Sequence, residues 1–159
     1  MTDKPNDDKF YLIGKLYSNL QSLEFVLRAA LYDNKSKPHN PIEYGMSINT
    51  FSVGDIVPEN ALTDYSTLKQ LIDRYNKEIA KDDPLLMVDN AIVTIRDALA
   101  HGRVSSNSPE DDMMILKFDI PKNSQVKVVF AQKMTKDWFK EKISKVYNEV
   151  LKVSSPYRI

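Results

Sequence analysis

The stretch Val88-Asp-Asn-Ala-Ile-Val-Thr-Ile-Arg-Asp-Ala-Leu-Ala-His-Gly-Arg-Val104 contains the most informative pattern in the chain. Its apolar residues recur at steps of four, three and four, the spacing of a helix that buries one face, and they are Val88, Ile92, Ile95 and Leu99. Asp83-Pro84 offers an acidic N-cap followed by a proline suited to the first helical position. Gly102 offers a stop, because glycine enters the left-handed conformation of a helix C-terminus without steric penalty. We therefore predict a core helix between Asp83-Pro84 and Gly102.

Three polar residues accompany this apolar stripe near the end of the predicted helix, namely Arg96, Asp97 and His101. On a regular helix, Arg96 and His101 would be separated by about 140° around the axis. Asp97 and His101 share a face, so the carboxylate can orient the imidazole or hold its positive charge. A last turn that tightens or unwinds at Gly102 would swing His101 back towards Arg96.

A histidine beside a fixed guanidinium is suited to the cleavage of RNA, because one group moves the proton while the other neutralises the phosphate. Structural roles also explain these residues. His101 can cap a helix end, and Arg96 with Asp97 can form a solvated ion pair of little energetic value. Arg103 can contact a phosphate or act as an ordinary cation at a helix end.

The segment Arg96-Asp-Ala-Leu-Ala-His101-Gly resembles the Arg-polar-x-x-x-His motif of HEPN domains (higher eukaryotes and prokaryotes nucleotide-binding). These are small all-helical proteins, and many are metal-independent ribonucleases that act as toxins or in antiviral defence. The resemblance implies an up-and-down four-helix bundle that cleaves single-stranded RNA through the ribose 2′-hydroxyl. It implies catalytic roles for Arg96, His101 and Asp97, in a cleft shared by two copies of the chain, with Arg103 as a candidate substrate-binding residue.

Asp97 departs from the family pattern, in which asparagine is frequent at this position, and a carboxylate near an RNA phosphate is repulsive. The resemblance is also compatible with a non-catalytic HEPN module that binds a nucleotide or a protein partner and keeps the motif as structure. A toxin subunit neutralised by an antitoxin would share the ribonuclease chemistry and differ in its partners.

The first helix is predicted from Phe10 to Asp33-Asn34, on the basis of apolar residues at steps of three and four: Ile13, Leu16, Leu20, Leu23, Leu27 and Leu31. Tyr17 and Phe25 broaden its apolar surface, which predicts a core helix. Residues 33–63 contain prolines and glycines that interrupt regular structure, together with the apolar residues Phe51, Val53, Ile56 and Val57. We expect an ordered inserted loop packed on the bundle, with a lid over the active surface as the alternative.

A second helix is predicted over residues 64–80, with Leu68, Leu71, Ile72, Tyr75 and Ile79 on one face. Alternating apolar residues on either side of the Pro121-Lys-Asn-Ser turn predict a β-hairpin over residues 113–132, after a polar loop that begins at Ser105. The last helix is expected to begin at a Thr135 cap, with inward-facing Phe139, Ile143, Val146, Tyr147 and Val150.

Composition limits the remaining possibilities. The chain has 22 basic and 22 acidic residues, so any contact with RNA must be local. It has no cysteine and two distant histidines, so we expect no metal and no cofactor, and His39 is expected to face water. The polar first residues and the lack of a long apolar run predict a cytoplasmic protein. The length of 159 residues predicts a single domain with a frayed tail over residues 1–8.

Overall fold

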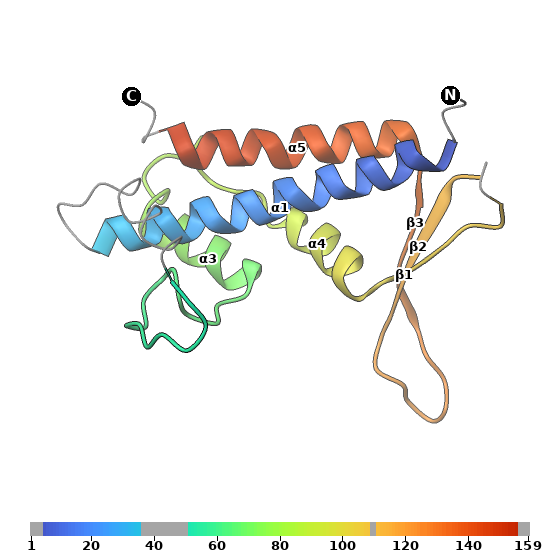
Figure 1. The fold of residues 1–159 in the computed structure, drawn as a ribbon, viewed down its shortest axis with the longest axis horizontal. Helices are drawn as coiled ribbons and strands as arrows, with labels where there is room; N and C mark the ends of the chain where they lie inside the picture. The colour runs from blue at the N-terminus through green and yellow to red at the C-terminus, as the bar shows by residue number, and fades with distance from the viewer. Residues whose placement is uncertain (1–4, 36–50, 109–110, 156–159) are drawn as a thin grey trace. The chain divides into compact units, whose positions relative to one another are not determined.

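The computed structural model describes residues 5–35, 51–108 and 111–155 (Figure 1). These residues form four helices and a three-stranded antiparallel sheet that precedes the last helix. The elements in chain order are α1 (Pro5–Lys35), α3 (Leu68–Glu78), α4 (Ala91–His101), β1 (Arg103–Ser105), β2 (Met113–Phe118), β3 (Val128–Met134) and α5 (Lys136–Ser154). The prediction of a mainly helical chain with strands before its last helix is confirmed.

The chain divides into two compact units. The first contains α1 up to Leu20, α4, the sheet and α5 up to Val146, and the second contains the described segments between Gln21 and Asn90 and α5 from Tyr147. The buried apolar side chains of the first unit are those of Leu16, Leu20, Ile92, Ile95, Ala98, Met113, Ile115, Met134, Phe139 and Val146. Those of the second unit include Leu23, Leu27, Leu31, Leu68, Leu71, Ile72, Tyr75 and Val153. The single domain remains a prediction.

In the first unit, the N-terminal part of α1 packs together with α4 (Figure 1). The helix begins at Pro5, earlier than predicted, so the expected frayed tail is helical from residue 5 onward. Tertiary contacts account for this early start. The Asp8 carboxylate pairs with Lys136 at 3.0 Å, and the Lys9 ammonium donates to the carbonyl oxygen of Asp111.

The apolar face of α1 consists of leucines, and the prediction of that face is confirmed for Leu16, Leu20, Leu23, Leu27 and Leu31. The expectation that Tyr17 and Phe25 extend the core is wrong, because their side chains remain 52% and 45% exposed. Tyr17 follows the buried Leu16 directly, and adjacent residues point about 100° apart around a helix. A similar correction applies to α5, where Tyr147 is exposed while its neighbour Val146 is buried.

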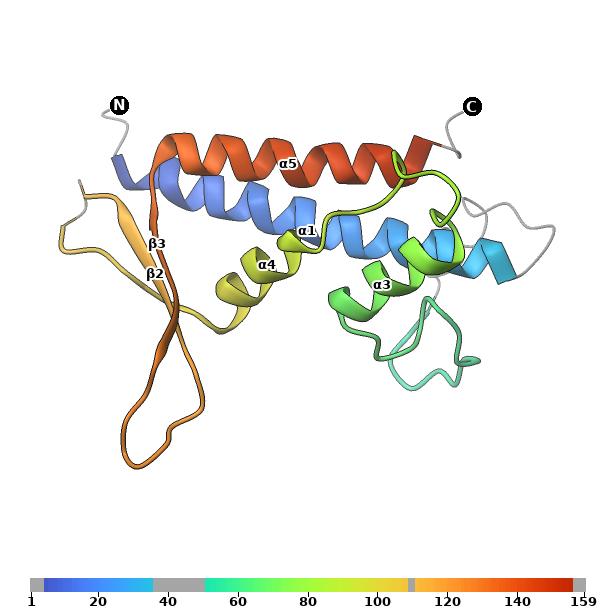
Figure 2. The same ribbon diagram turned by 180° about the vertical axis from the view of Figure 1, so that it is seen from behind.

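The strand β2 is central in the sheet, antiparallel to β1 on one side and to β3 on the other. The β2–β3 hairpin reverses at Asn123 and Ser124, whose positive φ angles of 50° and 62° suit a two-residue hairpin turn. Backbone hydrogen bonds of 2.8 and 2.9 Å join Lys122 and Gln125 across this turn, and Figure 2 shows the hairpin extending past α4. The predicted hairpin is confirmed, and β1 adds a third strand that was not predicted.

In the second unit, α3 begins later than the predicted residue 64 because a capping box fixes its first turn. The Thr67 hydroxyl accepts the Gln70 backbone N–H, and the Gln70 side chain accepts the Thr67 backbone N–H at 2.8 Å. Four of the five predicted apolar positions of this helix are buried, namely Leu68, Leu71, Ile72 and Tyr75.

The Arg28 guanidinium connects α1 to the segment before α3. It donates to the carbonyl oxygens of Ala61, Asp64 and Ser66 at 2.7–3.1 Å, and it pairs with the carboxylates of Glu24 and Asp64. Asp64 also accepts from Arg74 at 3.0 Å. Burial raises the pKa of Asp64, but hydrogen bonds from the Ser66 backbone and hydroxyl and from the two arginines outweigh it and hold this pKa at about 2.

The prediction of a packed loop over residues 33–63 is wrong for residues 33–35, which are helical, and for residues 51–59, which are exposed. The helix α1 continues to Lys35, and residues 36–50, including His39, lie outside the described residues. Residues 51–59 are exposed, with Val53 and Ile56 fully so. The only side chain of residues 51–63 that is buried is that of Ala61, next to the carbonyl that Arg28 binds. The backbone from Ala61 to Ser66 is thus held by the guanidinium rather than by apolar packing.

Within the parts of the chain that the structure describes, none of the helices combines the length and the apolar character needed to cross a membrane.

Candidate functional site

The helix that carries the Arg-polar-x-x-x-His motif is shorter than predicted. It begins at Ala91 rather than at Asp83-Pro84. The Asp83 carboxylate accepts the backbone N–H of Leu85 at 2.9 Å and closes a turn instead of starting a helix. Farther on, the Asn76 side chain forms hydrogen bonds of 2.8 and 2.9 Å with both backbone groups of Val88. Val88 thus belongs to the segment that precedes α4, and the Asn76 side chain holds its backbone there.

The C-terminus of α4 lies where predicted, but Gly102 ends the helix for a different reason. Its φ is not in the left-handed region. Its N–H donates to the carbonyl oxygen of Ala98 at 2.6 Å, as in a continuing helix. A Cβ at this position would overlap that same oxygen and would lie 2.9 Å from Cγ1 of Ile115. Glycine is therefore required here chiefly because a Cβ would overlap the Ala98 oxygen of the same helix end, and the Ile115 side chain of β2 crowds the position further.

The buried face of α4 consists of Ile92, Ile95 and Ala98. Leu99, which was predicted to be on this face, is only partly buried, and Val88 precedes the helix. The close approach at Gly102 places the small Ala98, rather than the larger Leu99, on the buried face of the last turn. Arg96 and Asp97, between Ile95 and Ala98, are partly exposed.

Asp97 is the centre of a small charged cluster. Its Oδ1 lies 3.4 Å from the Arg96 guanidinium, and its Oδ2 lies 3.6 Å from the Lys117 ammonium on β2. The three side chains are each about one-third exposed, at 35%, 36% and 30% for Arg96, Asp97 and Lys117. The cluster has two positive charges and one negative charge, so it retains a net positive charge that a phosphate could approach.

His101 is the last residue of α4, and its side chain is exposed. Among the residues that the structure describes, no hydrogen bond or ion pair joins its imidazole to Arg96 or Asp97. The predicted orientation of His101 by Asp97 is therefore not seen, because the carboxylate is directed to the two cations instead. The imidazole is accessible to a ligand, and no hydrogen bond to a described residue fixes it.

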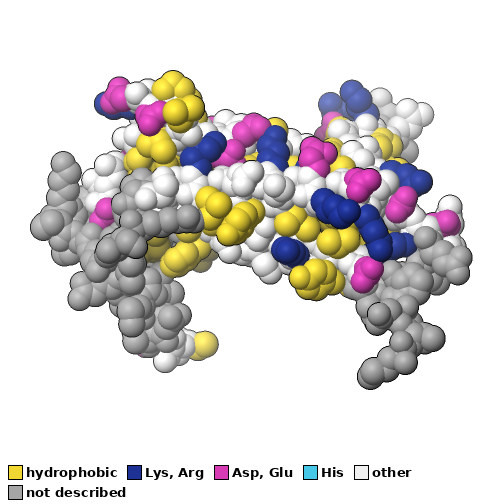
Figure 3. Space-filling view, turned by 90° about the horizontal axis from the view of Figure 1, so that it is seen from above, with side chains coloured by type: hydrophobic (Ala, Val, Ile, Leu, Met, Phe, Trp, Pro, Cys, Tyr) yellow, Lys and Arg dark blue, Asp and Glu magenta, His cyan; other side chains and the backbone are white. Residues whose placement is uncertain are grey.

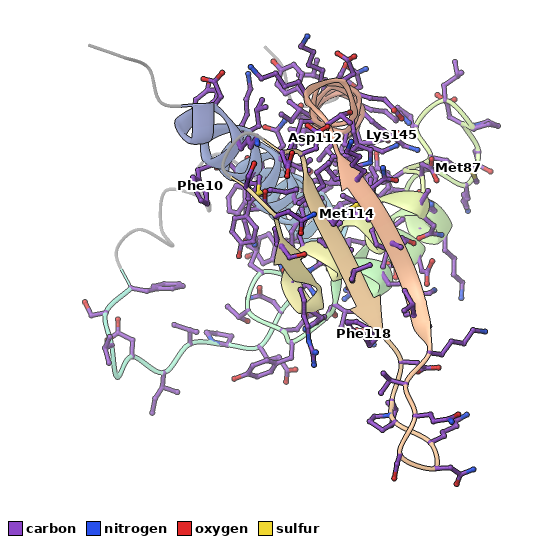
Figure 4. The ribbon with its side chains drawn as sticks, turned by 90° about the vertical axis from the view of Figure 1, so that its right-hand side faces the viewer. Phe10, Met87, Asp112, Met114, Phe118 and Lys145 are labelled. Carbon is purple, nitrogen blue, oxygen red and sulfur yellow. The ribbon has the colours of Figure 1, made fainter. Side chains whose placement is uncertain are left out.

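Arg103 stacks on an aromatic ring instead of joining the motif residues. Its guanidinium carbon lies 5.0 Å from the centre of the Phe118 ring. Side chains alternate between the two sides of a strand, and Lys117, one position before Phe118, faces Asp97 of α4. Arg103 and Phe118 therefore lie on the opposite face of the sheet, called the outer face below. Figure 4 shows Phe118 and Met114, which share this side of β2.

The structure thus brings Arg96 and Asp97 together, adds Lys117, and separates Arg103 from them by the thickness of the sheet. Lys117 and Phe118 were not identified from the sequence as site residues. The alternation of side chains along β2 was visible in the sequence, but the sequence did not show which residues lie against each face of the strand. No cluster of three or more potential metal ligands occurs among the described residues.

Comparisons with known proteins give no further assignment: no protein-family model, no curated protein and no solved structure matches this chain.

Proposed function

We propose that this protein is an endoribonuclease of the HEPN type, a helical bundle that cleaves single-stranded RNA without a metal ion. The observation that supports this proposal is the arrangement at the end of α4. An exposed histidine follows, by about one helical turn, a cluster that is about one-third exposed and has a net positive charge. The residues that act in this proposal are Arg96, Asp97 and His101, and Lys117 adds a second cation.

The proposed reaction is an internal transesterification. The 2′-oxygen of the ribose attacks the adjacent phosphorus, a 2′-O–P bond forms and the P–O5′ bond breaks. His101 accepts the proton of the 2′-hydroxyl or supplies the proton that the leaving 5′-oxygen takes up. Arg96 binds the non-bridging phosphate oxygens, whose negative charge grows as the bonds rearrange. Asp97 holds the guanidinium in position through the contact of 3.4 Å.

A second copy of the chain would complete the site. One chain supplies a single Arg96 and a single His101, about 140° apart around a regular helix. The HEPN resemblance implies a two-fold dimer in which paired motifs form one cleft. The N-terminal part of α1 supports self-association, because it exposes Phe10, Tyr11 and Tyr17 by 65%, 66% and 52%. Sedimentation at tens of micromolar tests this, and a monomer throughout the range would contradict the composite cleft.

The test of the reaction uses single-stranded RNA and DNA of the same sequence in the presence of EDTA. Wild-type protein is expected to cleave only the RNA and to leave a 2′,3′-cyclic phosphate on the 5′ fragment, since DNA lacks the nucleophile. His101→Ala and Arg96→Ala are each expected to be slower by about two orders of magnitude or more. Arg96→Lys should recover only part of the loss, because a point charge does not reproduce the bidentate fork.

Lys140→Gln is the matched control, because it removes a charge from α5 at a side chain that is 74% exposed and pairs with Asp137 on the same helix. It should cleave RNA at the wild-type rate. Activity that persists equally in His101→Ala, purified in the same way, would indicate a contaminating nuclease and overturn the proposal. A requirement for added magnesium would overturn the proposed mechanism.

One observation favours the second candidate, a non-catalytic HEPN module that binds a nucleotide or a protein partner. The ion pairs of Asp97 with Arg96 and Lys117 also suit a purely structural link between α4 and β2. Under that candidate, no RNA is cleaved, and Asp97→Ala lowers the free energy of unfolding. A role as a toxin subunit held by an antitoxin would leave the chemistry of the first candidate unchanged.

A further inference from the structure

We propose that single-stranded RNA docks on the outer face of the sheet and along the β2–β3 hairpin, with Arg103, Phe118, Lys122 and Lys127 as its main contacts. This inference rests on the proposed function, which names single-stranded RNA as the substrate. It deepens that function by identifying the surface that binds the nucleotides next to the bond that is cleaved.

The first support is the stacked pair on the outer face. The Arg103 guanidinium lies over the Phe118 ring at 5.0 Å, and the Arg103 side chain is exposed. Unpaired bases stack on aromatic rings and on guanidinium planes, so this pair offers a platform for a base. Arg103 also carries the charge that a neighbouring phosphate requires.

The second support is the exposure and charge of the hairpin end. Every residue from Asp119 to Val129 is exposed, including the apolar Ile120, Val126, Val128 and Val129. Lys122 and Lys127 form no ion pair among the residues that the structure describes, so both ammonium groups are available to phosphates. The one acidic side chain, Asp119, already accepts the backbone N–H of Ile120 at 2.8 Å.

Charge complementarity favours a polyanion over a protein partner on this surface. Together, the stacked pair and the exposed end of the hairpin carry Arg103, Lys122 and Lys127 against Asp119. The surface of α5 contrasts with this arrangement, since Figure 3 shows side chains of both charge signs intermixed. The α5 lysines Lys136, Lys140 and Lys142 are paired with Asp8, Asp137 and Glu141. The hairpin is thus the better site for a negatively charged strand.

The third support is proximity along the chain to the proposed catalytic histidine. Arg103 begins β1 only two residues after His101, a backbone distance of at most about 7 Å. A strand that stacks on the Arg103–Phe118 pair therefore passes close to the imidazole. To reach Arg96, which lies on the other side of the sheet, the bound strand then passes around the edge strand β1.

The experiment measures the binding of a fluorescently labelled, single-stranded RNA by anisotropy in EDTA, with His101→Ala in every protein so that no cleavage occurs. Adding Lys122→Gln with Lys127→Gln is expected to raise the Kd about tenfold. It should also reduce the slope of log K against log salt by about 1.4, because two phosphate contacts of a single strand are removed. Phe118→Leu and Arg103→Gln should each raise the Kd about tenfold, with little change of slope in Phe118→Leu.

The matched control adds Lys136→Gln and Lys140→Gln to the same parent. It removes two positive charges, as the hairpin variant does, from α5 side chains that are 63% and 74% exposed. It should keep the Kd and the slope of the parent. The proposal would be overturned if the hairpin variant had the Kd and slope of the His101→Ala parent. It would also be overturned if the control variant lost as much affinity as the hairpin variant. The hairpin lysines are fully on the surface, so this variant tests the proposal even where Phe118→Leu fails to fold.

Cleavage assays separate the two proposals. If the wild-type protein binds RNA through the hairpin but cleaves none, the docking surface stands and the ribonuclease fails. If cleavage is present while the hairpin variants bind normally, the ribonuclease stands and the docking surface fails. Hairpin variants that turn a dimer into a monomer without weakening RNA binding would overturn the docking surface in favour of a contact between two copies of the chain.

Discussion

The side chain of Asn76 holds both backbone groups of Val88. Its Oδ1 accepts the N–H of Val88 at 2.8 Å, and its Nδ2 donates to the carbonyl oxygen at 2.9 Å. One residue of α3 thereby fixes the segment that leads into α4. Lys152 contributes to the same segment by donating to the carbonyl of Met87 at 2.8 Å.

Replacing Asn76 by Ala should lower the free energy of unfolding by about 2–3 kcal/mol, because the backbone groups of the buried Val88 lose both partners. The better helix propensity of alanine offsets only about 0.5 kcal/mol of this loss. Urea denaturation measures the change, with Asn148→Ala on the exposed surface of α5 as control. Equal midpoints for the two variants would show that water replaces the amide without cost.

Replacing Gly102 by Ala should destabilise the protein by about 2 kcal/mol or more, since the added Cβ overlaps the Ala98 oxygen and crowds Ile115. Gly14→Ala on α1 is the control, because nothing lies within 4 Å of the position of its added Cβ. That variant should gain up to about 1 kcal/mol from helix propensity. Thermal melts compare the two, and a stable Gly102→Ala protein would mean that the helix end and β2 separate easily.

The Asp64 carboxylate should make stability depend on pH in acid. Its pKa of about 2 in the folded protein lies below the ordinary value of 3.8, so its contribution is complete above pH 3.8 and is lost as the pH falls towards 2. The shift corresponds to about 1–2 kcal/mol after allowance for solvent screening. The urea midpoint of Asp64→Asn should therefore lie below that of wild type at pH 6, and this difference should shrink at pH 2.5. Asp137→Asn, 93% exposed, should follow wild type at both pH values.

Substitutions at different positions of α4 should affect either the stability of the protein or its activity. Ile92→Ala should cost about 2–5 kcal/mol because this side chain is completely buried, whereas Leu99→Ala should cost less because Leu99 is only partly buried. His101→Ala should change the melting temperature little and, under the proposed function, abolish RNA cleavage. A larger loss of stability in His101→Ala than in Ile92→Ala would assign the histidine a structural role.

Asp97→Asn tests whether the negative charge of Asp97 weakens the binding of an RNA phosphate to the charged cluster. The substitution removes the negative charge next to Arg96 and Lys117 but keeps an oxygen that can accept from the guanidinium. The KM for single-stranded RNA is expected to fall severalfold, because both cations become available to the substrate. Steady-state kinetics would contradict this if kcat fell strongly at unchanged KM, since the carboxylate would then be needed for the chemical step.

The elements defined by local periodicity were predictable from the sequence. The leucine face of α1, four positions of α3 and the β2–β3 hairpin follow from spacing alone. The start of α3 was also readable, because Thr67-Leu-Lys-Gln70 has the pattern of a capping box. The start of α4 was not, since the segment before it is bonded to Asn76, which comes from a different helix.

The candidate site was predictable only in part for a similar reason. Arg96, Asp97 and His101 were recognised because they are close together in the sequence. Lys117 reaches Asp97 only once β2 lies against α4, and Phe118 lies under Arg103 only once β1 pairs with β2. The role of Gly102 was misread because its need for glycine comes from the Ala98 oxygen and the Ile115 side chain beside it and not from a left-handed φ angle.

The strand β3 is an edge of the sheet and is seven residues long, so its unpaired backbone groups offer a template for another strand. Two features limit such pairing. The register shifts between Lys117 and Phe118, which interrupts a regular ladder, and the Gln132 side chain donates to the carbonyl of Lys133 at 2.7 Å. A foreign strand would have to displace this amide and approach the Lys133 charge. These two features leave less of this edge open to pairing with a foreign strand.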